Sequence, residues 1–297
     1  MTRGRATLIG FTAVLSWALL ALFTALSGDV PPFQLLAMTF SVATAIGIVG
    51  SLARGSSPLA HLRQPAPVWL LGVGGLFGYH FFYFLALRNA PAVEASLIAY
   101  LWPLLIVVFS ALLPGERLRW FHVGGALLGL AGAALLVTKG QSLEIDPRYT
   151  LGYIAAGVCA LTWSSYSVAS RRFGHVPTDA VGGFCAAAAI LAVPCHLIFE
   201  TTVWPQTIVE WLAVLALGLG PVGGAFFTWD IGVKKGDIQV LGASSYAAPL
   251  LSTLVLVAAG LAPATPEVAI ACVLIVGGAL LAAHRLLRRK ASRAEAV

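Results

Sequence analysis

The chain has 297 residues, of which 59% are hydrophobic and 10% are charged, and its formal net charge is +6. So apolar a composition leaves too little polar surface to cover a water-soluble globule, and we expect an integral membrane protein. The basic residues then act as topology signals, and we expect no nucleic-acid partner.

Apolar runs long enough to cross a membrane recur along the whole chain. A helix needs roughly 20 residues to cross a hydrocarbon core of about 30 Å. Ten such runs lie at residues 6 to 27, 33 to 53, 66 to 87, 93 to 113, 119 to 138, 149 to 170, 178 to 199, 208 to 233, 239 to 261 and 266 to 284. None shows the alternating pattern of a membrane barrel, so we expect an all-α protein with ten transmembrane helices.

The distribution of Lys and Arg predicts the orientation. With the N-terminus in the cytoplasm, fifteen of the eighteen basic residues fall on the cytoplasmic side, and Arg88, Lys139 and Arg148 fall outside. Cytoplasmic segments of membrane proteins are enriched in Lys and Arg. Both termini are therefore predicted to be cytoplasmic, with the residues from Arg285 onward as a basic tail. The first run is longer than a signal-peptide core, so we expect it to be retained.

The sequence also repeats itself. Tyr100 and Pro103 in the fourth run have the spacing of Tyr246 and Pro249 in the ninth, and 249 − 103 = 146. The same offset pairs Trp17 with Trp163, Gly132 with Gly278, and the "GDVP" of 28 to 31 with the "GHVP" of 174 to 177. Five helices per half is an odd number, so the halves 1–143 and 144–297 are predicted to have inverted topology. Such repeats are typical of secondary transporters.

The two prolines are candidate kink or gating positions. Pro103 cannot donate to the carbonyl of Ala99, nor Pro249 to that of Ser245, so each is expected to bend its helix. Tolerated packing kinks are the alternative interpretation.

Aromatic and hydroxyl side chains near the middle of the runs are candidates for the site. Spacings of three and four residues place them on shared helix faces. The expected substrate-binding residues are Trp17, Tyr79, His80, Tyr83, Tyr100, Trp102, Trp163, Ser244, Ser245 and Tyr246. His80 is the preferred polar contact, with a substrate carboxylate as one partner. The alternative is helix packing joined by hydrogen bonds. We expect no catalytic residue, cofactor or metal.

Two further features have structural interpretations. Gly125, Gly129 and Gly132 in the fifth run, and Gly278 in the tenth, predict a closely packed scaffold pair. Asp230 lies four residues before Lys234, so the two are expected to pair.

Residues 86 to 136, "ALRNAPAVEASLIAYLWPLLIVVFSALLPGERLRWFHVGGALLGLAGAALL", resemble the EamA repeat of the drug/metabolite transporter superfamily. Residues 78 to 107 resemble the YddG-type aromatic amino acid exporters. The resemblance implies a ten-helix basket of two inverted repeats, multi-pass in the bacterial inner membrane, that exports amino acids. One departure is the "GER" of Gly115 to Arg117, which has no counterpart in the second half.

The sequence therefore predicts a secondary transporter, not an enzyme, that exports aromatic and other large neutral amino acids by alternating access. Its partners are the amino acid and the lipid bilayer. An exporter of other small metabolites or drugs is the main alternative; an intramembrane enzyme or passive channel is less favoured, since catalytic motifs and filter sequences are absent. Coupling to protons or another ion, and the oligomeric state, with a monomer as one option, stay open.

Overall fold

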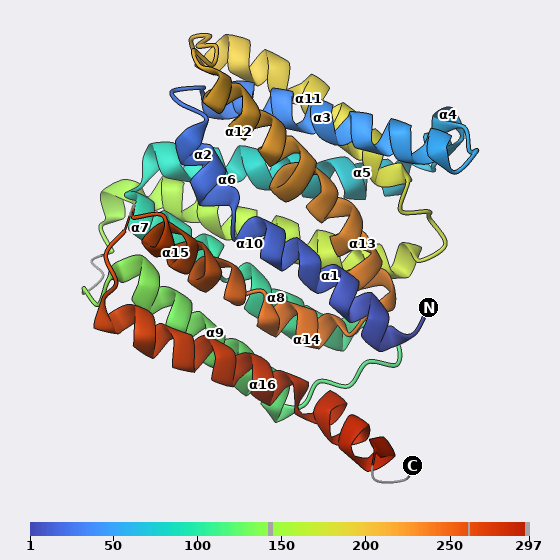
Figure 1. Cartoon of the computed structure of the whole chain (residues 1–297), viewed down its shortest axis with the longest axis vertical. Coiled ribbons are helices and arrows are strands. Elements are labelled where there is room, and N and C mark those ends of the chain that lie inside the picture. The colour runs from blue at the N-terminus through green and yellow to red at the C-terminus, as the bar shows by residue number, and fades with distance from the viewer. Residues whose placement is uncertain (142–144, 261, 295–297) are drawn as a thin grey trace.

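The computed structural model describes residues 1–141, 145–260 and 262–294, with side chains up to residue 284. The described chain is helical, and its helices form one bundle, with the N-terminus and the end of α16 at the same end (Figure 1). The α-helices are α1 (Arg3–Trp17), α2 (Leu20–Leu26), α3 (Pro32–Ala53), α4 (Pro58–His61), α5 (Ala66–Val73), α6 (Tyr79–Asn89), α7 (Ala92–Ala99), α8 (Trp102–Phe109), α9 (Trp120–Thr138), α10 (Thr150–Ser170), α11 (Ala180–Phe199), α12 (Ile208–Leu219), α13 (Ala225–Lys235), α14 (Ile238–Ser244), α15 (Ala247–Ala258) and α16 (Pro266–Ala294). Short turns of other helical types are η1 (Gly74–Gly78), η2 (Ser110–Leu112), η3 (Pro147–Tyr149), η4 (Arg171–Phe173) and η5 (Gly220–Gly224).

Nine helical units in the described ranges are long and apolar enough to cross a membrane. They coincide with nine of the ten predicted runs, and the chain is a multi-pass membrane protein. The helix at the remaining run, α10, is 21 residues long. It falls outside the nine because the stretch from Thr162 to Ser167 carries Thr, Trp, Ser and Tyr, which lower its hydropathy.

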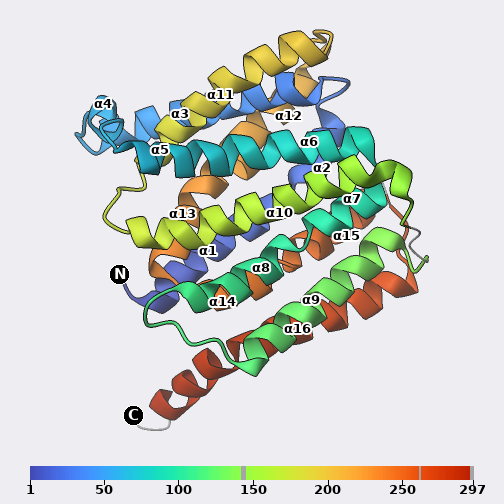
Figure 2. The same cartoon turned by 180° about the vertical axis from the view of Figure 1, so that it is seen from behind.

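The main helix pairs join the two halves of the chain. α1 packs on α13, α6 on α10, α3 on α11, α8 on α14 and α9 on α16. Figures 1 and 2 show α3 and α11 along one side of the bundle, α9 and α16 along the opposite side, and the other pairs between them.

The α9–α16 pair is the predicted glycine-lined scaffold. A Cβ atom added at Gly125 would lie 2.4 Å from the carbonyl oxygen of Gly278, and one added at Gly132 would lie 3.1 Å from that of Ala271. Only residues without bulky side chains allow backbones to approach so closely. The prediction of a close scaffold pair is confirmed.

The α3–α11 pair is fastened at both ends. At one end the Arg54 guanidinium donates to the Asp179 carboxylate. At the other end the Glu200 carboxylate accepts from the backbone N–H of Phe33 at 2.9 Å and of Gln34 at 3.2 Å. Glu200 thus caps the first turn of α3, where free N–H groups favour an anion.

The sequence predicted that Pro103 and Pro249 bend their helices. In the structure each proline follows a break that divides the helix into two. α7 ends at Ala99 and α8 starts at Trp102, and α14 ends at Ser244 and α15 starts at Ala247. Pro103 and Pro249 stand in the first turn after each break, where a missing N–H costs least. One detail was wrong: the Ser245 carbonyl is not freed, since it accepts from the N–H of Ala248 at 3.0 Å.

Two π-helical turns were not predicted from the sequence. They are η1 in the third apolar run and η5 in the eighth, and both are rich in glycine. Their positions differ by 220 − 74 = 146 residues, the offset of the internal repeat. Such turns widen a helix locally and are frequent at functional sites.

Candidate functional site: an aromatic cavity between the helices

A cavity of about 720 Å³ lies between α2, α3, α6, α7, α10, α13 and α15. This volume is within the usual range for small-molecule sites. Seven of the predicted site residues line it: Trp17, Tyr79, His80, Tyr83, Tyr100, Trp102 and Trp163. Pro249 of the predicted kink pair lines it as well. The structure thus brings together aromatic residues that are up to 146 positions apart in the sequence.

The cavity extends towards one end of the bundle. Val30 and Pro32, on either side of the start of α3, line it, as do Ala25 near the end of α2 and Leu87 near the end of α6. The loops that join these helices lie at the end of the bundle opposite the N-terminus (Figure 1). We call this the outer end, and the end that carries Arg3 the inner end.

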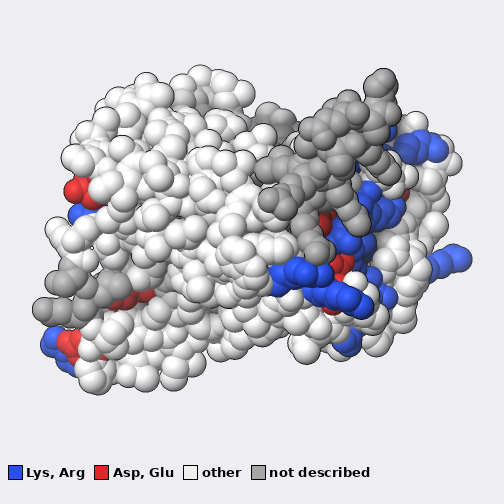
Figure 3. Space-filling view, turned by 90° about the horizontal axis from the view of Figure 1, so that it is seen from below, with Lys and Arg blue, Asp and Glu red and all other residues white. Residues whose placement is uncertain are grey.

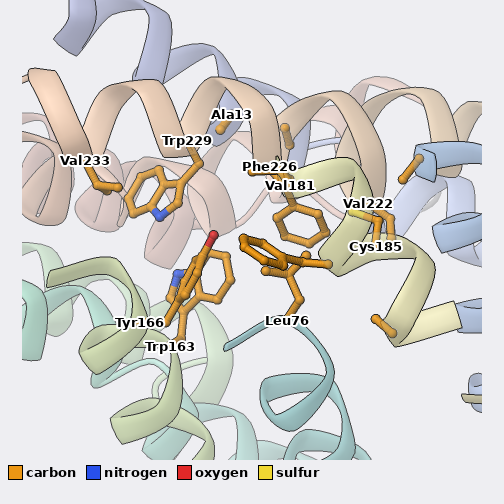
Figure 4. Packing of buried hydrophobic residues seen from close by; sticks show 14 of the residues in the cluster. Ala13, Leu76, Trp163, Tyr166, Val181, Cys185, Val222, Phe226, Trp229 and Val233 are labelled. Carbon is orange, nitrogen blue, oxygen red and sulfur yellow. The ribbon is translucent and has the colours of Figure 1, made fainter. Parts of the chain in front are cut away.

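Four tryptophans close the cavity on its inner side. Trp17, Trp102, Trp163 and Trp229 are in mutual contact, with all six centroid distances between 5.1 and 6.3 Å. Figure 4 shows Trp163 of α10 and Trp229 of α13 facing each other. The indole N–H of Trp17 donates to the Pro221 carbonyl at 3.0 Å, which ties α1 to η5. We call these four residues the tryptophan cluster.

The wall formed by α6 and α7 carries tyrosine, histidine and serine side chains, and we call it the polar wall. Tyr79 and Tyr83 are one helical turn apart on α6, and their rings stack with centroids 6.1 Å apart. The hydroxyl groups of Tyr83 and Ser96 lie 3.4 Å apart. His80 Nδ1 lies 2.7 Å from the Leu76 carbonyl, which can only accept, so Nδ1 carries a proton and Nε2 is the acceptor in the neutral ring.

Four predicted residues lie outside the cavity lining. The hydroxyl groups of Ser244 and Ser245 donate to the Leu241 carbonyl of their own helix at 3.1 and 2.7 Å. Pro103 is buried in α8. Tyr246 is fully buried, and its hydroxyl accepts from the N–H of Leu104 at 3.3 Å.

Tyr246 differs from its repeat partner Tyr100 for a steric reason. The Tyr246 ring packs over Gly129, where an added Cβ atom would lie 2.4 Å from a ring carbon. In the other half the position equivalent to Gly129 is Ile275, because 129 + 146 = 275. The Ile275 side chain leaves no space for a ring comparable to that above Gly129, and Tyr100 lines the cavity instead.

Two aromatic contributors, Phe226 and Trp229 of α13, were missed from the sequence. Phe226 lines the cavity and Trp229 completes the tryptophan cluster. The repeat carried a signal for both, since 226 − 146 = 80 and 229 − 146 = 83 pair them with His80 and Tyr83. The offset therefore relates one wall of the cavity to the other.

An ionic network lies at the inner end. The Glu116 carboxylate, from the "GER" segment, pairs with Arg3 at 3.0 Å and with Arg171 at 2.9 Å. Arg3 also pairs with Asp237 at 3.1 Å, and Arg171 donates to the Val233 and Gly236 carbonyls. Burial lowers the pKa of Arg171, and Glu116 opposes this shift. In Figure 3, most of the visible Lys and Arg atoms lie at one end of the molecule, and a few lie at the other.

Comparison with known proteins gives the family. The model of the EamA-like transporter family matches residues 4–138 and 150–283. The aromatic amino acid exporter YddG of Ancylobacter novellus is 61% identical over 283 residues, covering 95% of this chain and 98% of the relative. YddG of Escherichia coli is 25% identical over 95% of this chain and 97% of the relative.

Two more likenesses differ in extent. The pseudopaline exporter CntI of Pseudomonas aeruginosa is 33% identical over 56% of this chain and 57% of the relative. A solved crystal structure of a protein with 59% sequence identity matches with a TM-score of 0.92, covering 97% of this chain and 99% of the other. From the two family matches and the near full-length relatives, this chain belongs to the EamA-like transporter family.

Proposed function

We propose that the chain is built from two inverted repeats, residues 1–143 and 144–297, with α10 as the tenth membrane helix. The boundary at 143 and 144 lies outside the described residues. Two features support the proposal. The first is the helix pairing: adding 146 to the residues of α1 gives α10, and subtracting 146 from those of α13 gives α6. The contact of α1 with α13 thus corresponds to the contact of α10 with α6. The second is the pair of contacts at the two ends of α3 and α11. Phe33 corresponds to Asp179, since 33 + 146 = 179, and Glu200 corresponds to Arg54, since 200 − 146 = 54, so the Phe33–Glu200 contact matches the Asp179–Arg54 contact.

The proposed orientation places the inner end, with both termini, in the cytoplasm. Arg3, Arg54 and Arg171 take part in the ionic contacts at that end. Basic residues on the cytoplasmic side are the usual signal in membrane proteins. The basic side chains from Arg285 onward lie outside the described side chains. In this orientation the cavity extends towards the periplasm, and the membrane is the bacterial inner membrane.

The proposed function is export of amino acids, above all aromatic and other large neutral ones. The observation that carries it is the cavity of about 720 Å³, walled by Trp and Tyr rings from both halves. Such rings offer large flat apolar surfaces together with polar tips. The name of the A. novellus relative, an aromatic amino acid exporter, supports the same substrate class. The chain is thus proposed as a transporter and not an enzyme.

The polar wall suggests how the zwitterion is held in the cavity. With Nδ1–H committed to Leu76, neutral His80 presents Nε2 as an acceptor, which suits the substrate ammonium group. This differs from the sequence-based expectation of a carboxylate partner. The hydroxyl groups of Tyr79, Tyr83 and Ser96 are donors on the same wall that suit the carboxylate.

Alternating access would require the inner end to open while the outer end closes. In the state described, the tryptophan cluster and the Glu116 network separate the cavity from the inner end. The helix breaks between α7 and α8 and between α14 and α15 are positions where segments can reorient. We infer that the described state is open outward.

Purified protein in liposomes tests the function. Vesicles preloaded with labelled phenylalanine, threonine, a polyamine or a cationic dye are compared with protein-free vesicles, with and without a proton gradient. Release of phenylalanine well above the empty-vesicle rate is expected. Release of only the dye or the polyamine would favour an exporter of other metabolites or drugs, and the gradient arm reports proton coupling.

A further inference from the structure

A buried ion pair lies on the inner side of the tryptophan cluster, away from the cavity. The ammonium group of Lys234 is 2.9 Å from Oδ1 of Asp230, and both side chains are at least 95% buried. The pairing predicted from their spacing is confirmed. The Thr178 hydroxyl donates to Oδ2 of Asp230 at 2.7 Å, and Lys234 donates to the Val176 carbonyl at 3.0 Å.

The order of residues along α13 places this pair between the tryptophan cluster and the inner end. Phe226 lines the cavity, Trp229 belongs to the tryptophan cluster, and Asp230 and Lys234 follow towards the inner end. At 1.5 Å per residue, Lys234 lies about 12 Å further along the helix than Phe226. A route that follows this face of α13 from the inner end to the cavity would therefore pass the pair.

The pair is closed off in the state described. The space beside it, lined by Tyr166, Ser170 and the pair itself, measures about 10 Å³, which is room for about one water molecule. Val176 and Thr178, which bond to the pair, belong to the segment between η4 and α11 at the inner end. The loop between η4 and α11 therefore holds both charges in place.

Stability alone gives little reason to keep two charges at this depth. Removing both ions from water costs several kcal/mol each, and a buried pair is often no more stable than apolar residues of the same shape. Ionisable groups inside membrane helices are accordingly most often functional. What such a pair offers is one fixed cation and one fixed anion about 3 Å apart, which matches the two charges of an amino acid zwitterion.

We propose that Asp230 and Lys234 form the inner recognition site for the zwitterion. When the inner end opens, the ammonium group of Lys234 takes the α-carboxylate of the substrate, and the Asp230 carboxylate takes its α-ammonium group. The bond between the two side chains is exchanged for two bonds to substrate, and it re-forms when the substrate moves on to the cavity. This inference rests on the proposed function, because it names how that substrate class is selected.

The exchange adds a recognition step for both charges on the inner side, before the substrate reaches the polar wall of the cavity. Trp and Tyr rings bind phenethylamine and 3-phenylpropionate by the same ring contacts as phenylalanine. A charge-assisted hydrogen bond distinguishes them, since phenethylamine leaves Lys234 without a partner and 3-phenylpropionate leaves Asp230 without one. Each analogue should compete roughly tenfold or more weakly than phenylalanine from the inner side.

Competition in sidedness-controlled vesicles tests the proposal. Uptake of labelled phenylalanine from the inner face is measured against phenethylamine and against 3-phenylpropionate. Lys234→Gln should lose the discrimination against phenethylamine, and Asp230→Asn that against 3-phenylpropionate, each by roughly tenfold. Lys235→Gln, which changes the exposed neighbouring residue, is the matched control and should keep the wild-type ranking.

Folded variants that keep the wild-type ranking would show that the pair is only structural. A footprint on the wild-type protein guards against misfolding: phenylalanine should protect Lys234 from an amine-reactive reagent applied from the inner side, and phenethylamine should not. Equal labelling with both would overturn the proposal. Failure of the wild-type protein to transport phenylalanine would instead count against the proposed function. Protection of Lys234 from the reagent would in that case still show whether the pair binds phenylalanine.

Discussion

The indole rings of Trp17 and Trp163 meet edge to face, with centroids 5.8 Å apart. The two residues are related by the repeat, since 17 + 146 = 163. In the proposed inverted repeat, a residue that touches its own repeat partner lies near the axis that relates the two halves. The tryptophan cluster therefore sits where both halves meet, and motion of one half against the other changes its contacts first.

Trp163→Ala should weaken aromatic substrates selectively. Aromatic contacts contribute about 0.5 to 1.5 kcal/mol beyond the burial of area, so affinity for phenylalanine should fall roughly threefold to tenfold, with a smaller change for threonine. Trp17→Ala should act similarly. Trp120→Ala, at a position 75% exposed, serves as the control. Equal losses for phenylalanine and threonine in transport assays would indicate a structural role for the cluster.

Glu116→Gln should favour the state that is open inward. The substitution removes the anion shared by Arg3 and Arg171 at the inner end. Because Arg3 is half-exposed, we expect a shift of only about 1 kcal/mol, or roughly fivefold in the ratio of states. Labelling of a cysteine placed beside Tyr166 should speed up from the inner side. Asp146→Asn, which breaks an exposed pair with Arg148, should leave labelling unchanged.

Gly75→Ala should be damaging where Gly74→Ala is tolerated. Both glycines lie in η1, but a Cβ atom at Gly75 would lie 2.3 Å from the Tyr166 ring, whereas Gly74 has open space. Overpacking of this kind costs about 1 to 3 kcal/mol. The expected result is a lower thermal unfolding temperature and slower transport for the first variant only. Similar unfolding curves for the two variants would contradict the packing described for η1.

Pro103→Ala and Pro249→Ala should slow transport without unfolding the protein. Alanine supplies an N–H group and permits a continuous helix across the breaks at residues 100 to 101 and 245 to 246, so one access state should be disfavoured. Transport rate is compared with the thermal unfolding of the same samples. If both variants transport at the wild-type rate, the prolines are packing features.

Reporter fusions test the proposed topology. A reporter that is active only in the periplasm should be silent after Val297 and active when inserted after Gln141, between the halves. Fusions after Gly55 and Gly174 should also be silent, because both loops carry basic residues. Activity after Val297 would contradict the cytoplasmic C-terminus and, with it, the inverted repeat.

Much of the fold could be predicted because membrane helices leave direct marks in a sequence. Long apolar runs gave the helices, and small residues at four-residue spacing gave the α9–α16 contact. The π turns and the break at Ala18 and Leu19 leave no comparable mark, since they depend on how neighbouring helices pack. α10 was found as a helix although its mixed aromatic and hydroxyl face makes it the least apolar of the runs.

The cavity residues were predicted best where a large aromatic side chain with a polar group lies near mid-run. Trp17, Tyr79 and Trp163 have no interfacial role at that depth, which pointed to a cavity. Tyr246 could not be placed in this way, because whether its ring turns inward depends on Gly129, a residue on another helix. Helical spacing predicts on which face of its helix a side chain lies, but it does not predict which residue of the neighbouring helix that side chain contacts.

The two ends of the α3–α11 pair respond differently to dissolved salt. The Arg54–Asp179 contact at the inner end is an ion pair whose arginine side chain is 57% exposed. The Glu200 contact at the outer end is made to backbone N–H groups, and its carboxylate side chain is 2% exposed. Mobile ions screen exposed charges over a Debye length of about 8 Å at physiological ionic strength, and they reach buried bonds far less. In the proposed orientation, the ionic strength of the cytoplasm therefore acts on the Arg54–Asp179 contact and has little effect on the Glu200 contact.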